Sequence, residues 1–315
     1  MGRLRDKMVS LSNHKMVGFL FSGQASQYIG MGKDLYETFP ESRVVFEKAG
    51  EILGFDLKNR CFEGPEELLR LTSVSQPAIL TVSIAAFAAF KAKNNIKPVY
   101  AAGLSLGEYT ALVAAKCLTL EDGLKLVRKR GEIMEQAAEK YPGKMAAILD
   151  LPLDKLKEIC ADSQAEIANL NSPGQVVISG KAKAVDKAMD LCSKAGAKRV
   201  IPLEVSGGFH SSLMIEASYE LKAVLGNTQF SPLDFPIVSN YTAAPETTVS
   251  QIKENLVCQM HSPVRWEDSM KFMLSKNVTT FFEFGPGKVL KGLMRKIEPE
   301  ARVISIEKKD DLINL

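Results

Sequence analysis

The pentapeptide GLSLG at residues 103–107, a G-x-S-x-G pattern, constrains this chain most. The apolar run VYAA at residues 99–102 predicts a buried strand before it, and the alanine-rich segment 108–116 favours a helix after it. A serine at such a strand-to-helix turn is a nucleophile elbow, whose glycines let crowded backbones approach. The turn exposes the Ser105 hydroxyl beside helical N–H groups that can stabilise an oxyanion. The alternative, a chance match, is weakened by the flanking elements.

Composition limits the classes of protein that this chain can belong to. Its 315 residues, 46% of them hydrophobic, suffice for a sizeable core in one large domain or two small ones. The formal net charge of +3 is too small to indicate nucleic-acid binding, although it is compatible with an acidic protein partner. We therefore expect no nucleic-acid partner.

Cysteine usage and hydropathy predict where the protein works. The five cysteines are odd in number and form no C-x-x-C pair, so we expect neither a disulfide framework nor a metal site, and a cytoplasmic protein. The longest apolar run, residues 78–90, is too short to span a membrane. Residues 1–15 are polar and basic and are read as a flexible leader; a processed transit peptide, which would place the enzyme in an organellar stroma, is the alternative.

The remaining pattern predicts an α/β fold with an inserted unit. Residues 16–21 form a first strand, and the small-residue loop after it lies where α/β folds bind ligands, although an ordinary βα turn would look the same. After residue 141 the predicted order becomes βαββαβ, which is a ferredoxin-like unit. We therefore expect a large α/β-hydrolase-like subdomain with a parallel sheet, residues 16–140 and 206–315, and a small ferredoxin-like subdomain, residues 141–205.

A serine nucleophile needs a general base, and the chain has three histidines. His14 lies in the leader, and His261 precedes Pro263 in a segment where a surface or capping role is the simpler reading. His210 follows a glycine-rich loop at the end of a predicted strand, which suits a base. Every acid between Ser105 and His210 falls in a predicted helix or in the inserted unit, so we expect a Ser–His dyad oriented by a neutral acceptor.

An arginine lies on the apolar face of the helix predicted from residue 119 to residue 139. Arg130 is three or four positions from Leu126, Val127, Ile133 and Met134. A cation on an inward face needs an anionic partner. The pattern leaves open whether that partner is a structural carboxylate, a substrate, or water reached by snorkelling.

Six ordered segments resemble malonyl-CoA:acyl carrier protein transacylases, over residues 16–297. They are GQASQ at residues 23–27, GLSLGEY at 103–109, RGEIM at 130–134, NSPGQ at 171–175, FHS at 209–211 and GPGK at 285–288. The resemblance implies an acyltransferase that moves malonyl from malonyl-CoA to the phosphopantetheine thiol of acyl carrier protein by a ping-pong mechanism through a malonyl-serine intermediate. It implies fatty-acid synthesis and no cofactor beyond the carrier's arm. Separately, because the sequence shows no repeating apolar surface stripe, we expect a monomer.

The resemblance also implies a role for each site residue. Ser105 is the nucleophile, His210 the base, and Gln259 orients the base through its main-chain carbonyl. The remaining implied residues contact the substrate: Arg130 clamps the malonyl carboxylate, backbone N–H groups of Gln24 and Leu106 form the oxyanion hole, and Phe209 fills the space of an α-methyl group.

The sequence departs from the family at the residue before the nucleophile. A histidine is usual there, and this chain has Leu104, so one polar contact beside the site is expected to be missing while the reaction persists. Two alternatives stay open: a stand-alone acyltransferase of a polyketide synthase, and a serine thioesterase or other hydrolase, which leaves Arg130 without a function.

Overall fold

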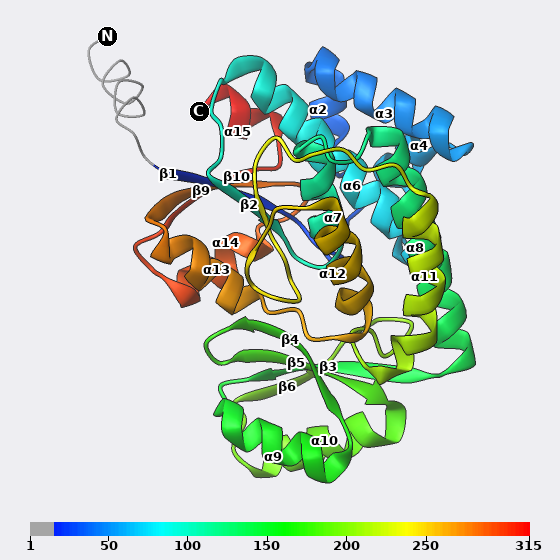
Figure 1. Cartoon of the computed structure of the whole chain (residues 1–315), viewed down its shortest axis with the longest axis vertical. Coiled ribbons are helices and arrows are strands. Elements are labelled where there is room, and N and C mark those ends of the chain that lie inside the picture. Colours follow the sequence, from blue (N-terminus) through cyan, green and yellow to red (C-terminus); the bar gives the residue numbers. More distant parts are fainter. Residues whose placement is uncertain (1–15) are drawn as a thin grey trace.

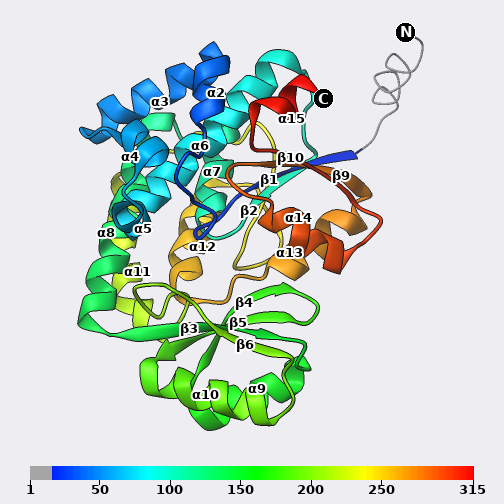
Figure 2. The same ribbon diagram turned by 180° about the vertical axis from the view of Figure 1, so that it is seen from behind.

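The structure, a computed structural model, describes residues 16–315, so the predicted leader lies outside the described part. The chain forms two lobes, each built on its own sheet (Figure 1). The larger lobe carries both the blue N-terminal strand and the red C-terminal helix, and the smaller lobe contains only the green middle of the chain. Figure 2 shows the same division from behind. This is the expected α/β fold class with an inserted unit.

The large sheet has the strand order β10-β9-β1-β2-β7-β8, with β1 between β9 and β2. Its pairs are parallel except β7 with β8, which is antiparallel. The strands are β1 (Met16–Phe21), β2 (Tyr100–Gly103), β7 (Ile237–Val238), β8 (Pro245–Glu246), β9 (Val278–Phe284) and β10 (Arg302–Ile306). The carboxyl ends of parallel strands share one edge, so the segments after β1, β2 and β7 converge there.

Helices cover both faces of this sheet (Figures 1 and 2). The helices of this lobe are α2 (Lys33–Thr38), α3 (Pro40–Leu53), α4 (Leu57–Glu63), α5 (Glu66–Arg70), α6 (Thr72–Lys93), α7 (Leu106–Ala114), α8 (Leu120–Lys140), α11 (Ile215–Asn227) after the short 3₁₀ turn Ser212–Met214, α12 (Val249–His261), α13 (Trp266–Ser275), α14 (Val289–Ile297) and α15 (Lys309–Ile313).

Helix α6 runs through the core and is longer than its sequence suggests. The apolar run and Pro77 predict a helix that starts at residue 77, but α6 begins at Thr72 and Pro77 lies inside it. The first turn packs closely against Gly131 of α8, and its Thr72 and Ser75 are buried; this packing outweighs the helix-breaking tendency of proline. By length and composition α6 could cross a membrane, yet 78% of its apolar window is buried inside the protein, as in a core helix.

The smaller lobe has the expected βαββαβ order and the antiparallel strand order β4-β5-β3-β6. Its elements are β3 (Gly143–Leu149), α9 (Leu153–Ser163), β4 (Glu166–Ser172), β5 (Gln175–Lys181), α10 (Ala182–Lys194) and β6 (Arg199–Pro202). A separate apolar cluster, which includes Ile148, Ile178 and Val185, lies under its helices. On that basis we propose that residues 141–205 are one subdomain and residues 16–140 with 206–315 the other.

Backbone hydrogen bonds join the two lobes. Leu170 N donates to Val264 O and Val264 N donates to Ala168 O, each at 2.9 Å, so β4 of the small lobe pairs with the segment between α12 and α13. Side chains that arise from the two lobes are therefore held at a fixed separation.

Replacing Gly131 by alanine tests the close approach of α8 to α6. A Cβ at Gly131 would lie 2.6 Å from both Ser73 Cα and Thr72 O, and backbone cannot yield as a flexible side chain does. We expect Gly131→Ala to lower the free energy of unfolding by about 1–3 kcal/mol in urea denaturation. The matched control is Gly292→Ala, which meets nothing within 4 Å and should be neutral or slightly stabilising. Equal effects of the two variants would contradict the close approach.

Candidate active site

The GLSLG segment forms a sharp turn between β2 and α7. Ser105 has φ 52° and ψ −101°, a conformation that L-residues seldom adopt. A side chain at Gly103 would collide with the backbone of Gly107, and one at Gly107 with the backbone of Phe21. The pattern therefore reflects steric necessity, and it leaves the Ser105 side chain buried but for a small opening.

His210 completes a hydrogen-bonded dyad with Ser105. The Ser105 Oγ to His210 Nε2 distance is 2.9 Å, and His210 Nδ1 lies 2.8 Å from the main-chain oxygen of Gln259. A carbonyl can only accept, so Nδ1 carries the proton and Nε2 is left to accept from the hydroxyl. The acceptor behind the histidine is neutral, as the lack of a suitably placed acid predicts.

His261, the other described histidine, ends α12, where Ser262 Oγ is 3.5 Å from its Nδ1. His14 lies outside the described residues.

The environment keeps His210 neutral. Burial and, to a smaller extent, the Arg130 charge lower the pKa of His210 to about 4, against the opposing effect of the hydrogen bond to the Gln259 carbonyl. An unprotonated imidazole is the form that can take a proton from a serine.

Arg130 is fully buried and points at the nucleophile. Its Nη2 donates to Ser105 Oγ and to Gln259 Oε1, both at 3.1 Å, and its Nη1 donates to Gln76 Oε1 at 2.8 Å. The guanidinium carbon lies 5.0 Å from the centre of the Tyr109 ring. All of these hydrogen-bond partners are neutral, so the site holds a positive charge next to the reactive hydroxyl.

The other predicted site residues lie around this dyad, and their roles stay predictions. Leu106 is the first residue of α7, where helical N–H groups lack intrahelical acceptors. The loop with Gln24 touches the elbow, since a Cβ on Gly23 would lie 2.5 Å from Leu104 O. Phe209, beside His210, is buried in the main core.

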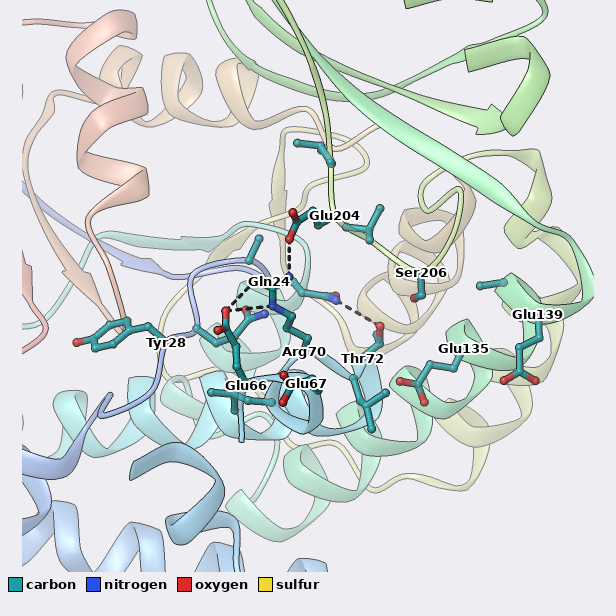
Figure 3. A pocket seen from close by; sticks show the side chains of 17 residues that line it. Gln24, Tyr28, Glu66, Glu67, Arg70, Thr72, Glu135, Glu139, Glu204 and Ser206 are labelled. Carbon is teal, nitrogen blue, oxygen red and sulfur yellow. Dashed lines mark hydrogen bonds and ion pairs between the residues drawn. The ribbon is translucent and has the colours of Figure 1, made fainter. Parts of the chain in front are cut away.

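A cleft of about 710 Å³ lies between the lobes and is lined by Gln24 (Figure 3). Gln24 Nε2 donates to Thr72 Oγ1 at 3.3 Å. Across its mouth Arg70 pairs with Glu66 at 2.7 Å and with Glu204, which comes from the segment after β6. Of the site residues predicted from sequence, only Gln24, on the loop after β1, is among the residues that line this cleft.

Sequence reasoning missed a buried polar cluster behind the elbow. Glu108 Oε2 accepts from Asn240 N and from Gln259 Nε2, each at 2.9 Å, and Glu246 accepts from Asn255 at 2.9 Å. Burial raises the pKa of both carboxyls, and the charge of Glu108 raises that of Glu246 further. Two features of the sequence could have indicated this cluster: Glu108 in the first turn of α7, and the polar pair Ser239 and Asn240 directly after β7.

No group of three or more His, Cys, Asp or Glu side chains that could hold a metal occurs within residues 16–315.

Comparison with known proteins gives a consistent family. Residues 18–304 match the acyl transferase domain family. The chain is 47% identical over 295 residues to a malonyl CoA-acyl carrier protein transacylase of Bacillus subtilis, covering 92% of this chain and 93% of that protein. It superposes with a TM-score of 0.92 on an acyl-carrier-protein-S-malonyltransferase from Bartonella henselae, at 38% identity over 95% of this chain and 97% of the other.

A malonyl-transacylase in complex with a type II PKS acyl-carrier protein superposes equally well. Its TM-score is 0.92 and its identity 37%, with coverage of 95% of this chain and 98% of the other.

The pH dependence of Ser105 reactivity tests the electrostatics of the dyad. Because the base must be neutral and its pKa is about 4, labelling by a fluorophosphonate should stay level from pH 8 to about pH 5 and fall only below that. Arg130→Gln removes a cation that lowers this pKa, so the inflection should move to higher pH. A wild-type inflection near the ordinary histidine value of about 6.5 would contradict this account of the site.

Proposed function

We propose, from the premise that this chain belongs to the acyl transferase domain family, that it transfers malonyl from malonyl-CoA to the phosphopantetheine thiol of acyl carrier protein for fatty-acid synthesis. The observation that carries the proposal is the buried Arg130 guanidinium, which hydrogen-bonds the hydroxyl of a Ser–His dyad. A dyad alone serves any acyl transfer, whereas a fixed cation beside it selects an acyl group that bears a negative charge.

The first half-reaction acylates Ser105. The hydroxyl oxygen attacks the thioester carbonyl while His210 Nε2 takes its proton, and the negative charge that develops on the carbonyl oxygen is held by the backbone N–H groups of Leu106 and Gln24. The carbon–sulfur bond then breaks, and the imidazolium returns its proton to the departing CoA sulfur. The products are a malonyl ester of Ser105 and free CoA.

The second half-reaction repeats these steps with the carrier thiol. His210 takes the thiol proton, the sulfur attacks the ester carbonyl, and the Ser105 oxygen leaves with the proton that His210 returns. We take the cleft of about 710 Å³ beside Gln24 as the path of the pantetheine arm of either substrate, because the loop that carries Gln24 touches the elbow at Leu104. CoA and carrier must use it in turn, which accounts for a ping-pong order.

Arg130 has two effects: it binds the malonyl carboxylate, and it changes the pKa of the base His210. A malonyl carboxylate can take two parallel hydrogen bonds from the guanidinium, which fixes the thioester carbon over Ser105 Oγ. The same ion pair neutralises the charge that lowers the pKa of His210. The base therefore becomes stronger once the correct acyl group is bound.

Residues beside the dyad support selection of malonyl. Phe209 is buried next to His210, where it would occupy the space of an α-methyl substituent. Leu106 is buried too and presents no polar atom from its side chain. We therefore expect methylmalonyl-CoA to be a poor substrate.

The setting of the reaction is also proposed. We expect a cytoplasmic monomer that needs no cofactor beyond the arm of its carrier and binds neither nucleic acid nor membranes, in line with the mild net charge of +3 and the core position of α6. The superposition on a transacylase in complex with a type II PKS carrier keeps a polyketide carrier as the alternative acceptor.

The covalent intermediate tests the proposed function. Incubation with malonyl-CoA should give an intact mass raised by one malonyl group, and carrier protein should remove it. Ser105→Ala should show no adduct, whereas Ser42→Ala, which removes a buried hydroxyl of α3 that donates to Ala85 O of α6, should keep it. Rapid release of free malonate without carrier would instead show a thioesterase.

Selectivity tests the clamp. We expect Arg130→Ala to lower malonyl loading about 10- to 100-fold, the value of a hydrogen bond to a charged group, and to gain acetyl loading from acetyl-CoA. The control is Arg128→Ala on the same helix, since Arg128 bonds Glu132 and Leu53 O away from the site. An unchanged malonyl-to-acetyl ratio in Arg130→Ala would remove the assigned role.

A further inference from the structure

Asn240 bonds the backbone of the elbow at two points through its side chain. It follows β7, the strand next to β2, and it is fully buried. Its side-chain Oδ1 accepts from Ser105 N at 2.6 Å, and its Nδ2 donates to Gly103 O at 2.7 Å. One amide group thus satisfies the backbone on both sides of the residue that carries the nucleophile.

This contact fixes which backbone groups remain free for chemistry. Ser105 has a positive φ, and such a conformation persists only where its surroundings determine it. Since the Ser105 N–H is already bonded to Asn240, it is turned away from the substrate side. An oxyanion donor at the elbow must then come from the next residue, Leu106.

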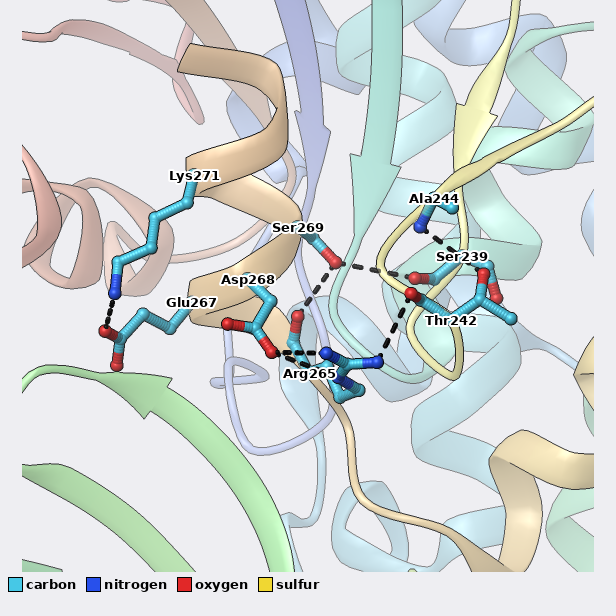
Figure 4. Close-up of polar contacts among 8 residues, drawn as sticks. All are labelled: Ser239, Thr242, Ala244, Arg265, Glu267, Asp268, Ser269 and Lys271. Carbon is cyan, nitrogen blue, oxygen red and sulfur yellow. Dashed lines mark hydrogen bonds and ion pairs between the residues drawn. The ribbon is translucent and has the colours of Figure 1, made fainter. Parts of the chain in front are cut away.

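The loop that carries Asn240 is itself held firmly (Figure 4). Ser239 N donates to Ala244 O at 3.0 Å, and Ser269 Oγ lies 3.4 Å from Ser239 O. Arg265 contributes twice: its N donates to Asn240 O at 2.9 Å and its Nη1 to Thr242 O at 3.4 Å. The amide is therefore presented by a braced turn.

Glu108 connects this brace to the base. Its Oε2 accepts both from Asn240 N and from Gln259 Nε2. Gln259 in turn bonds His210 through its main-chain oxygen. One buried oxygen therefore fixes the support of the nucleophile and the support of the base relative to each other.

We propose that Asn240 is a positioning residue for the Ser105 nucleophile, holding the backbone of residues 103 and 105 so that the hydroxyl meets His210, with Glu108 as its anchor. Asn240 touches no reacting atom, so its effect falls on the rate of acylation and leaves substrate binding intact. The inference rests on the proposed function only for its acyl donor, because a fluorophosphonate probe reports the same nucleophile without one.

Truncation of the amide is the first test. We expect Asn240→Ala to slow Ser105 acylation by malonyl-CoA and labelling by the fluorophosphonate together, on the order of 100-fold, with KM little changed. The matched control is Asn255→Ala, which also loses a buried asparagine hydrogen bond, to Glu246, and should keep its kcat. Equal kcat values in the two folded variants would overturn the proposal.

Asn240→Asp is the second test, and its readout is the pH dependence of fluorophosphonate labelling, which a purely structural role would leave unchanged. This variant can also be used if Asn240→Ala does not fold. An ionised carboxylate accepts from Ser105 N but repels Gly103 O, whereas its protonated form can donate to Gly103 O as the amide does. The titratable and charged groups around it are Glu108 of α7, which accepts from its backbone N–H, Glu246 of β8, whose strand pairs with β7, and Arg130 and His210, which both bond Ser105 Oγ. The two carboxyls favour protonation of the new carboxyl and the arginine opposes it.

The two substitutions give distinguishable outcomes. We expect the labelling rate of Asn240→Asp to rise as the pH falls from 8 to 5, where the wild-type rate stays level. A profile parallel to the wild type would overturn the proposal. If wild-type protein reacts with the fluorophosphonate but forms no malonyl adduct, the proposed function fails while the role of Asn240 remains testable with the probe.

Discussion

The buried guanidinium of Arg130 is the charge on which the rest of the site depends. A cation in the interior is stable only if its hydrogen-bonding groups are satisfied and a negative charge lies near. Its hydrogen bonds go to the neutral groups of Gln76, Ser105 and Gln259, and the Glu108 carboxyl is linked to it only through Gln259. A substrate carboxylate would form the direct ion pair that the protein itself leaves unmade.

Several segments far apart in sequence meet at this charge, and the fold explains why. The elbow follows β2, Asn240 follows β7, and the Gln24 loop follows β1, so all three lie at the carboxyl edge of one parallel sheet. Arg130 and Gln259 come from helices, and His210 comes from the segment that returns from the small lobe. The inserted lobe thus supplies one wall of the cleft while the sheet supplies the fixed groups.

The parts that local pattern controls were predictable from the sequence. The elbow glycines are required by close backbone contacts, and the βαββαβ order follows from alternating patterns, so both appear in the structure. The roles of the site residues beyond the Ser–His pair are implied only by the resemblance to a family. Without that resemblance, the sequence does not decide whether Arg130 binds a structural carboxylate or a substrate. The roles of Asn240, Glu108 and Glu246 are not predictable from the sequence, because they depend on contacts between distant segments. An asparagine after a short strand looks like an ordinary turn residue. The sequence predicts too late a start for α6, because Pro77 favours a first helical position and the packing around the preceding turn is a tertiary contact.

The charges of the buried cluster bear on how the base works. Burial and the neighbouring Glu108 both favour the protonated form of Glu246. Burial raises the pKa of Glu108 to about 7, while its hydrogen bonds and the Arg130 charge oppose that rise, so Glu108 balances the cation of Arg130 only in part before substrate arrives. A malonyl carboxylate then adds one negative charge to a site from which water is largely excluded. Attack then creates a positive charge on His210 and an equal negative charge on the thioester carbonyl oxygen. The acyl carboxylate favours the first and the oxyanion hole the second, so the transition state gains from an acyl carboxylate more than the ground state does. An acetyl group brings no such charge, and Arg130 then continues to oppose protonation of His210.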